Sequence, residues 1–214
     1  KSSSIVFQIE KKEGRYHSKI FNTKLEKVET IISKNILYAG QKNALKFIYP
    51  KYYPLFSNSQ YSPWVAINFE LSQLIPGYQK WQNDMLGVNQ NLMGFVNSET
   101  QKTDNNVLTM YMCFNPSERK EMPKIMTNPK AIIKEAINYL NQFFNTNSEV
   151  YIQSAHIKVM GHAMPIPTKG YLFNDRNKKT KNENFFFAGV DNGRLPLMFE
   201  ALDSGIFAAN LINN

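Results

Sequence analysis

Residues 185–213 read FFFAGVDNGRLPLMFEALDSGIFAANLIN, which predicts a strand, a turn and a helix in that order. The apolar run 185–188 ends at Gly189, and Pro196 is typical of the first position of a helix. Such a unit directs backbone N–H groups toward the carboxyl end of the strand, where α/β proteins bind ligands. Small residues recur every four positions along the helix, at Ala201, Gly205 and Ala209. This stripe predicts close packing on a sheet, with or without a ligand nearby.

This stretch resembles the C-terminal FAD-contacting motif of flavin amine oxidases, phytoene desaturases and protoporphyrinogen oxidases. In those families a strand ends in Phe-Ala-Gly-acidic, and a helix follows with the pattern Gly-Ala-x-x-Ser-Gly-x-x-Ala-Ala. The residues that match are Phe187, Ala188, Gly189, Ala201, Ser204, Gly205, Ala208 and Ala209. Val190 stands where the relatives have the acidic residue, with Asp191 one place later, and Glu200 replaces the first glycine of the helix pattern.

Two further segments extend the resemblance over most of the chain. Residues 161–164, Gly-His-Ala-Met, resemble the Trp-Gly-His-Ala-Met-x-x-Pro-x-Pro-Gly-Phe stretch of a bacterial branch of the amine-oxidase-like family, with Met160 in place of the tryptophan. Near the N-terminus, Val6 and Ile9 fit a Val-x-x-Ile pair, and residues 36–39 fit the strand that returns after a hairpin.

The resemblance implies an α/β fold with an α+β substrate region. The chain would be the C-terminal portion of a two-domain, FAD-binding, Rossmann-like flavoprotein with a mixed-sheet substrate domain. Residues 1–48 and 172–214 would complete the FAD-binding domain, and residues 49–171 would form the substrate-binding domain. No Gly-x-Gly-x-x-Gly fingerprint for a dinucleotide occurs in the sequence. We therefore expect a missing N-terminal FAD-binding segment, from the same gene or a separate chain, as a partner.

FAD is the cofactor that the resemblance implies, and a small molecule is the expected substrate. The positions expected to contact the cofactor are Val6, Gly189, Val190, Asp191, Leu197, Met198 and Phe199. The positions expected to contact the substrate are His162, Tyr171 and Trp64. No catalytic residue and no metal ligand is assigned.

Each of these interpretations has a plainer alternative. The final helix has the pattern of an ordinary amphipathic terminal helix. His162 is also explained as a residue that locks a turn by hydrogen bonding, and Tyr171 is also explained by core packing. Standard amine oxidases carry a lysine in a strand of the substrate region, and residues 62–71 contain none. The alternative function is therefore a non-catalytic binding module that keeps the flavoprotein fold.

Hydrophobic periodicity predicts the remaining elements. Strands are expected at residues 5–9, 16–21, 29–38, 64–71, 92–97, 107–114 and 150–159. Helices are expected at residues 42–48 and 129–144, the second with Asn128 as its N-cap.

Composition excludes several classes of function. The chain has 25 basic and 17 acidic residues, a net charge of +8, but aromatic residues do not interleave with the basic ones as in nucleic-acid-binding modules. Cys113 is the only cysteine, so neither an intrachain disulfide nor a cysteine metal cluster is possible. No stretch is long and apolar enough for a membrane span. A cytoplasmic location is favoured, although the chain begins inside a strand pattern and a targeting signal upstream stays open.

Overall fold

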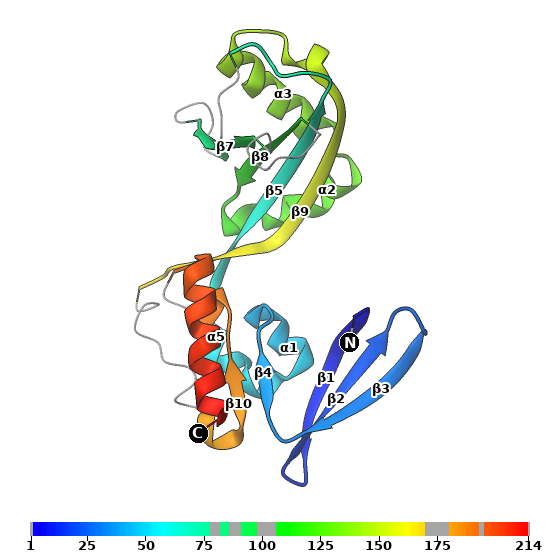
Figure 1. Cartoon of the computed structure of the whole chain (residues 1–214), viewed down its shortest axis with the longest axis vertical. Helices are drawn as coiled ribbons and strands as arrows, with labels where there is room; N and C mark the ends of the chain where they lie inside the picture. Colours follow the sequence, from blue (N-terminus) through cyan, green and yellow to red (C-terminus); the bar gives the residue numbers. More distant parts are fainter. Residues whose placement is uncertain are drawn as a thin grey trace. The chain divides into compact units, whose positions relative to one another are not determined.

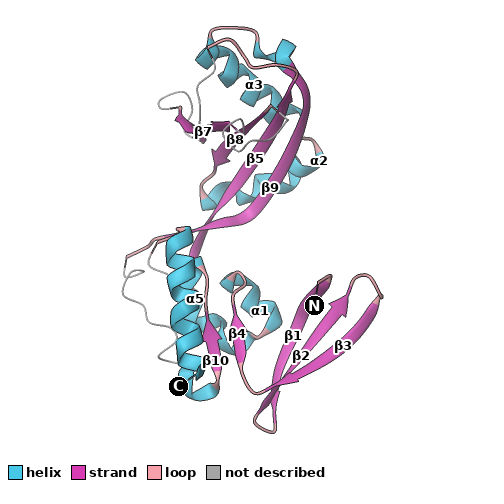
Figure 2. Ribbon diagram, in the orientation of Figure 1, coloured by secondary structure: helices cyan, strands magenta, loops and turns pink. Residues whose placement is uncertain are grey.

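The computed structural model divides the chain into two compact units, which are described separately (Figure 1). Unit 1 comprises Lys1–Gln60 and Pro165–Asn214, and unit 2 comprises Tyr61–Met164. The structure describes residues 2–77, 82–85, 91–97, 106–169, 180–192 and 195–213. Both units combine helices with sheets (Figure 2), so the coarse expectation of a mixed α/β chain is confirmed.

Unit 1 begins with a three-stranded antiparallel sheet, the β-meander that the sequence predicts. Its strands are β1 (Ser4–Lys12), β2 (Arg15–Asn22) and β3 (Lys27–Ser33), in the order β1-β2-β3. Glu13 and Gly14 connect β1 to β2 with φ values of 50° and 75°, as tight hairpin turns require. The register shifts between Val6 and Gln8, so β1 carries a bulge there.

A second, parallel pair of strands joins the two parts of unit 1. Strand β4 (Ile36–Tyr38) pairs with β10 (Phe185–Phe187), and Tyr38 lies opposite Phe187. The prediction of one strand over residues 29–38 is wrong, because the chain leaves the meander after Ser33 and enters this second sheet. The helical elements of unit 1 are η1 (Lys42–Ala44), α1 (Leu45–Ile48), η2 (Pro50–Phe56), η7 (Lys181–Glu183), η8 (Val190–Asn192) and α5 (Met198–Asn213).

Aromatic side chains fill the core of unit 1. Buried members of this cluster are Ile9, Tyr16, Leu45, Tyr49, Tyr52, Phe56, Phe185 and Phe187. The ring centroids of Tyr52 and Phe185 are 4.7 Å apart, and those of Phe56 and Phe187 are 4.9 Å apart. These contacts tie η2 to β10, so the boundary between the units falls after Gln60 and not after residue 48 as predicted.

Unit 2 is a five-stranded sheet covered by helices. Its strands are β5 (Gln60–Leu71), β6 (Gln82–Asp84), β7 (Leu92–Asn97), β8 (Val107–Cys113) and β9 (Ile152–Ile166), in the order β6-β7-β8-β5-β9. Its helical elements are η4 (Pro116–Glu121), α2 (Met122–Thr127), α3 (Lys130–Phe144) and η5 (Ser148–Tyr151). The pairs β5–β8, β6–β7 and β7–β8 are antiparallel, so none of these three pairs supplies the parallel strands of the predicted mixed sheet.

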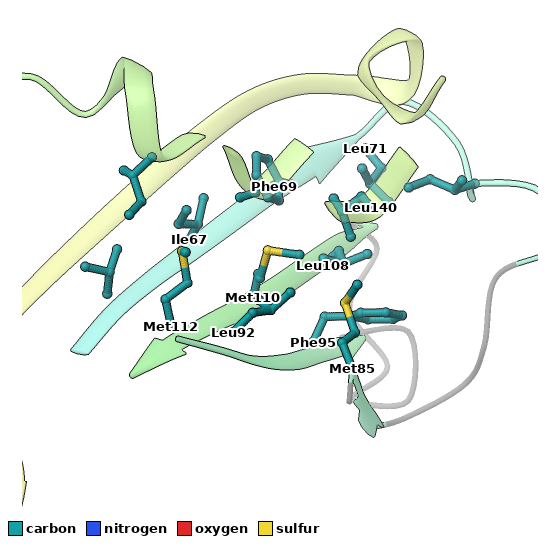
Figure 3. Packing of buried hydrophobic residues seen from close by; sticks show 14 of the residues in the cluster. Ile67, Phe69, Leu71, Met85, Leu92, Phe95, Leu108, Met110, Met112 and Leu140 are labelled. Carbon is teal, nitrogen blue, oxygen red and sulfur yellow. The ribbon is translucent and has the colours of Figure 1, made fainter. Parts of the chain in front are cut away.

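The core of unit 2 lies between the sheet and α3 (Figure 3). In β5 the odd-numbered residues of 65–71 are buried, as the alternation of a half-buried strand requires. Helix α3 contributes Ile132, Ala136 and Leu140 at a helical spacing. The predicted span of α3 is confirmed, but its N-cap is Pro129 rather than Asn128.

Candidate cofactor site

The candidate site of unit 1 lies where the parallel strands β4 and β10 end. The amide of Ala188 donates to the Tyr38 carbonyl oxygen at 3.1 Å, which extends the pairing by one residue. Gly189 follows with φ +95°, a conformation that side chains with a Cβ rarely adopt. The sharp turn at this position therefore requires glycine, and it sends the chain from β10 toward α5.

Ser204 of α5 fixes this turn. Its Oγ accepts a hydrogen bond from the Gly189 amide at 2.8 Å and lies 3.1 Å from the Gly189 carbonyl oxygen. Ser204 and Ala208 are the buried residues of α5, and Ala208 packs with Phe186 and Ala188. Ser204 thus provides the acceptor for the Gly189 amide, while the Gly189 carbonyl oxygen also accepts from the Asn192 amide at 3.0 Å.

The predicted small-residue stripe of α5 is not the line along which this helix packs. Ala209 is exposed, and a Cβ at Gly205 would have open space around it. The residues of α5 that pack inward lie one position earlier, at Ser204 and Ala208. The Ser204 hydroxyl reaches the Gly189 turn, which a glycine in its place could not do because glycine has no side chain.

Lys42 is a residue of the site that sequence reasoning misses. It is fully buried, and its ammonium donates to the carbonyl oxygen of Ala188 and, at 3.1 Å, to that of Gly40. Its main-chain amide donates to Oδ2 of Asp191 at 2.8 Å. A lysine between Gln41 and Asn43 in the sequence gives no signal of burial, since lysine is nearly always exposed.

Asp191 and Val190 lie in η8, directly behind the turn. Asp191 is only 4% exposed, and its carboxylate caps the start of η1 by accepting from the main-chain amide of Lys42, whereas the resemblance implies that it contacts the cofactor. Burial raises the pKa of the neighbouring Tyr38 phenol to about 12, and the charge of Asp191 contributes to the same shift. Asn192 has a buried Oδ1 without a hydrogen-bond donor among the described residues.

The start of α5 lies two residues after Pro196, not at Pro196 as predicted. The amide of Ala201 donates to the Leu197 carbonyl oxygen at 3.1 Å, which is the first bond of the helical ladder. The amides that precede Ala201 have no acceptor four residues earlier in the helix. Leu197, Met198 and Phe199 are 51%, 75% and 70% exposed, so the three predicted cofactor contacts are at the surface of unit 1.

Val6 lies on β1, with 39% of its surface exposed. The next residue, Phe7, lines a groove of about 550 Å³ between β1 and residues 47–51. Lys11 and Lys51 also line this groove, and Lys51 forms an ion pair with Glu183.

Trp64 lines a pocket of about 250 Å³ on the face of the unit 2 sheet that does not meet α3. The other lining residues are Asn83, Asp84, Met93, Gly94, Phe95, Val96 and Tyr111. The ring centroids of Trp64 and Tyr111 are 6.3 Å apart, and Nε1 of Trp64 is buried without an acceptor among the described residues. The lining combines three aromatic residues, Trp64, Phe95 and Tyr111, with the carboxylate of Asp84, which is the mixture of apolar and polar groups found in small-molecule sites.

His162 lies on β9, and its ring meets that of Tyr61 edge to face with centroids 5.7 Å apart. Arg119 joins the same two strands, because Nε donates to the Gly161 carbonyl oxygen at 2.7 Å and Nη2 to that of Tyr61 at 2.6 Å. His162 is not among the residues that line the Trp64 pocket. Tyr171 lies outside the described residues.

Two kinds of feature are absent from the described part of the chain. Its His, Cys, Asp and Glu side chains form no group of three that would hold a metal ion. None of its helices combines the length and the apolar character that a membrane crossing requires.

Comparison with known proteins yields no family assignment. No protein-family model matches this chain. The search of curated proteins likewise finds no match.

Proposed function

We propose that this chain is the C-terminal portion of an FAD-dependent oxidoreductase, similar to the flavin amine oxidases, that transfers a hydride from a small or lipophilic substrate to flavin. The observation that carries the proposal is the Gly189 turn. It lies at the carboxyl ends of two parallel strands, precedes a helix start, and is fixed by Ser204. Nucleotide cofactors are bound at such places in α/β proteins.

The residues around the turn fit such a cofactor. Gly189 has no side chain to stand between its backbone and a bound group, and a Cβ there would lie 3.4 Å from the Ala39 carbonyl oxygen. The start of α5 offers N–H groups and the positive end of a helix dipole, which favour negative charge on a bound group. The buried Oδ1 of Asn192 supplies an acceptor for a hydroxyl.

When bound, the isoalloxazine ring would itself accept the hydride. The role of this chain is then to hold and orient the cofactor and the substrate. The turn at Gly189–Asp191 would contact the cofactor's linker, and Leu197, Met198 and Phe199 would present the helix start. Trp64 and Tyr111 would bind the apolar part of a substrate in the pocket of unit 2.

Uptake of flavin tests this proposal directly. The protein is produced together with the upstream part of its gene, and its absorbance and its retention of added FAD are measured. We expect a yellow protein. Gly189→Val should abolish retention, because a branched residue does not adopt φ +95°. Gly205→Ala is the matched control, since its Cβ meets open space and retention should be unchanged. A folded, colourless protein that takes up no FAD contradicts the proposal.

The second candidate function is a binding module without turnover. Val190 at the acidic position, Glu200 at the glycine position and the lysine-free run 62–71 favour it. A screen of amines and polyenes with oxygen or a dye as acceptor separates the two functions. Turnover on the order of 1 per second excludes the binding module.

A further inference from the structure

Lys42 is a buried charge with three backbone acceptors. Its side chain has no exposed surface, and its ammonium donates to the carbonyl oxygen of Ala188. The same nitrogen is 3.1 Å from the Gly40 carbonyl oxygen and 3.4 Å from that of Tyr38. An ammonium group has three N–H donors and no acceptor, so its bonding capacity matches these three oxygens.

Two aromatic rings also lie near this charge. The ammonium lies 5.3 Å from the ring centroid of Tyr38 and 5.8 Å from that of Phe187, within the range of cation–π attraction. Carbonyl oxygens and aromatic faces both present negative charge. A buried cation is stable in such surroundings, whereas an isolated one is not.

The three carbonyl groups belong to the ends of the two parallel strands. Tyr38 ends β4, Gly40 follows it, and Ala188 follows β10. The Tyr38 oxygen already accepts the last bond between the strands, from the Ala188 amide at 3.1 Å, whereas the Gly40 and Ala188 oxygens need donors from elsewhere. Removing the donors would leave buried acceptors unsatisfied next to the Gly189 turn.

We propose that the carbonyl oxygens of Tyr38, Gly40 and Ala188 form a binding site for a primary ammonium ion, which the chain fills with its own Lys42. Lys42 is thereby a positioning residue, because it fixes the backbone from which Gly189 turns toward α5. This inference does not depend on FAD, since it concerns only the described contacts of unit 1. It has a chemical consequence: when the side chain is shortened, a free alkylammonium ion should take its place.

The test uses Lys42→Ala in the full chain. This substitution removes the atoms from Cγ to Nζ, which n-propylammonium replaces one for one. Thermal unfolding is followed by circular dichroism in n-propylammonium chloride and in an equal concentration of sodium chloride. We expect the midpoint of Lys42→Ala to fall by on the order of 10 °C, because one partner of a buried charged contact is lost. Propylammonium should restore most of this loss in a saturable manner.

Two control additives show whether the positive charge and N–H donors of propylammonium, rather than its volume, restore the midpoint. 1-Propanol fills the same space without a charge, and tetramethylammonium carries the charge without an N–H group, so neither should restore the midpoint. Equal recovery with propanol, or no recovery with propylammonium, would overturn the proposal. Lys46→Ala is the matched control, since Lys46 is an exposed lysine of α1, and its midpoint should not respond specifically to the amine.

A second variant covers the case in which Lys42→Ala does not fold. Lys42→Met fills the space but has no donors, so it should remain destabilised and insensitive to propylammonium. A Met variant as stable as the unsubstituted protein would contradict the site. The Ala variant is also refolded from urea with and without the amine, and folding only in its presence supports the site. If the Ala variant refolds neither with nor without propylammonium, this result counts against the proposed ammonium site.

Discussion

The two units of this chain differ in how their cores are built. Unit 2 packs mostly aliphatic and methionine side chains, with the buried phenylalanines Phe69, Phe95 and Phe114 among them, between one sheet and one helix. Unit 1 instead packs tyrosine and phenylalanine rings from segments far apart in the sequence, with Tyr16, Tyr52 and Phe185 in mutual contact. Hydrogen bonds also join these distant segments: the Tyr16 hydroxyl donates to the Glu183 carbonyl oxygen at 2.6 Å.

This difference shows two ways to stabilise a fold. The unit 2 core depends on apolar area and close packing, which are non-directional. The unit 1 core depends on fewer, larger rings with preferred geometries and on hydrogen bonds with fixed partners. Substitutions in the two cores should therefore act on separate unfolding transitions. Trp64 and Trp81 both lie within Tyr61–Met164, so tryptophan fluorescence reports unit 2. Tyrosines occur in both units, so a tyrosine signal reports unit 1 only after the transition seen by tryptophan is accounted for.

The largest effect is expected from Phe185→Ala. Phe185 is fully buried and contacts Tyr16, Tyr38, Tyr49, Tyr52 and Phe187. Removing its ring should lower the free energy of unfolding of unit 1 by about 3–5 kcal/mol, the cost of a large cavity. Urea unfolding followed by near-ultraviolet circular dichroism of tyrosine measures this loss. An equal shift in the tryptophan signal would show that the two cores are not independent.

Leu140→Ala is the counterpart in unit 2. Leu140 has no exposed surface and belongs to the core between α3 and the sheet (Figure 3). The substitution should lower the stability of unit 2 by about 2–4 kcal/mol and shift the tryptophan transition. Val150→Ala serves as the control, because Val150 is 67% exposed and its shortening should change little. A tryptophan transition left in place by Leu140→Ala would argue against this core.

Ser204→Ala tests a directional contact. The substitution removes the acceptor for the Gly189 amide, and should cost unit 1 about 1–2 kcal/mol. Ser57→Ala is a control, because the Ser57 hydroxyl bonds an exposed carbonyl oxygen of Pro54 and its loss should cost less. Urea unfolding of both variants measures the difference, and equal losses would mean that Ser204 does not hold the turn.

Alkaline pH should act on unit 1 without any substitution. Burial raises the pKa of Tyr16 and of Tyr38 to about 12, above the ordinary value of 10. The folded state therefore keeps these phenols neutral after the unfolded chain ionises. Their contribution is complete below pH 10 and is lost as the pH rises to about 12. Urea unfolding at increasing pH measures it, and Tyr16→Phe should reduce the pH dependence. A pH-independent stability of unit 1 between 10 and 12 would exclude this linkage.

Local patterns in the sequence suffice to predict much of the fold. The spans of β7, β8 and α3 follow from alternation or helical spacing within each segment. The break between β3 and β4 could not be predicted, because it depends on pairing with β10, far along the chain. The boundary of unit 1 has the same cause, since the Tyr52–Phe185 contact joins distant segments.

The candidate site is predictable only in part. Gly189 and Ser204 stand out through the resemblance, and the structure brings them together. Lys42 does not stand out in the sequence, because a lysine becomes buried only where hydrogen-bond acceptors from several segments meet. The burial of the Asp191 side chain could not be predicted either, because its hydrogen-bond partner, the amide of Lys42, lies far away in the sequence.

Arg119 has a consequence for how the chain is assembled. Its guanidinium bonds the carbonyl oxygens of Tyr61 and Gly161, so the points where the chain enters and leaves unit 2 lie side by side. Unit 2 is thus an insertion with adjacent ends, a form that domain grafting tolerates well. A short glycine–serine linker from Gln60 to Pro165 should close unit 1 without unit 2, and we expect residues 61–164 to fold when they are produced alone.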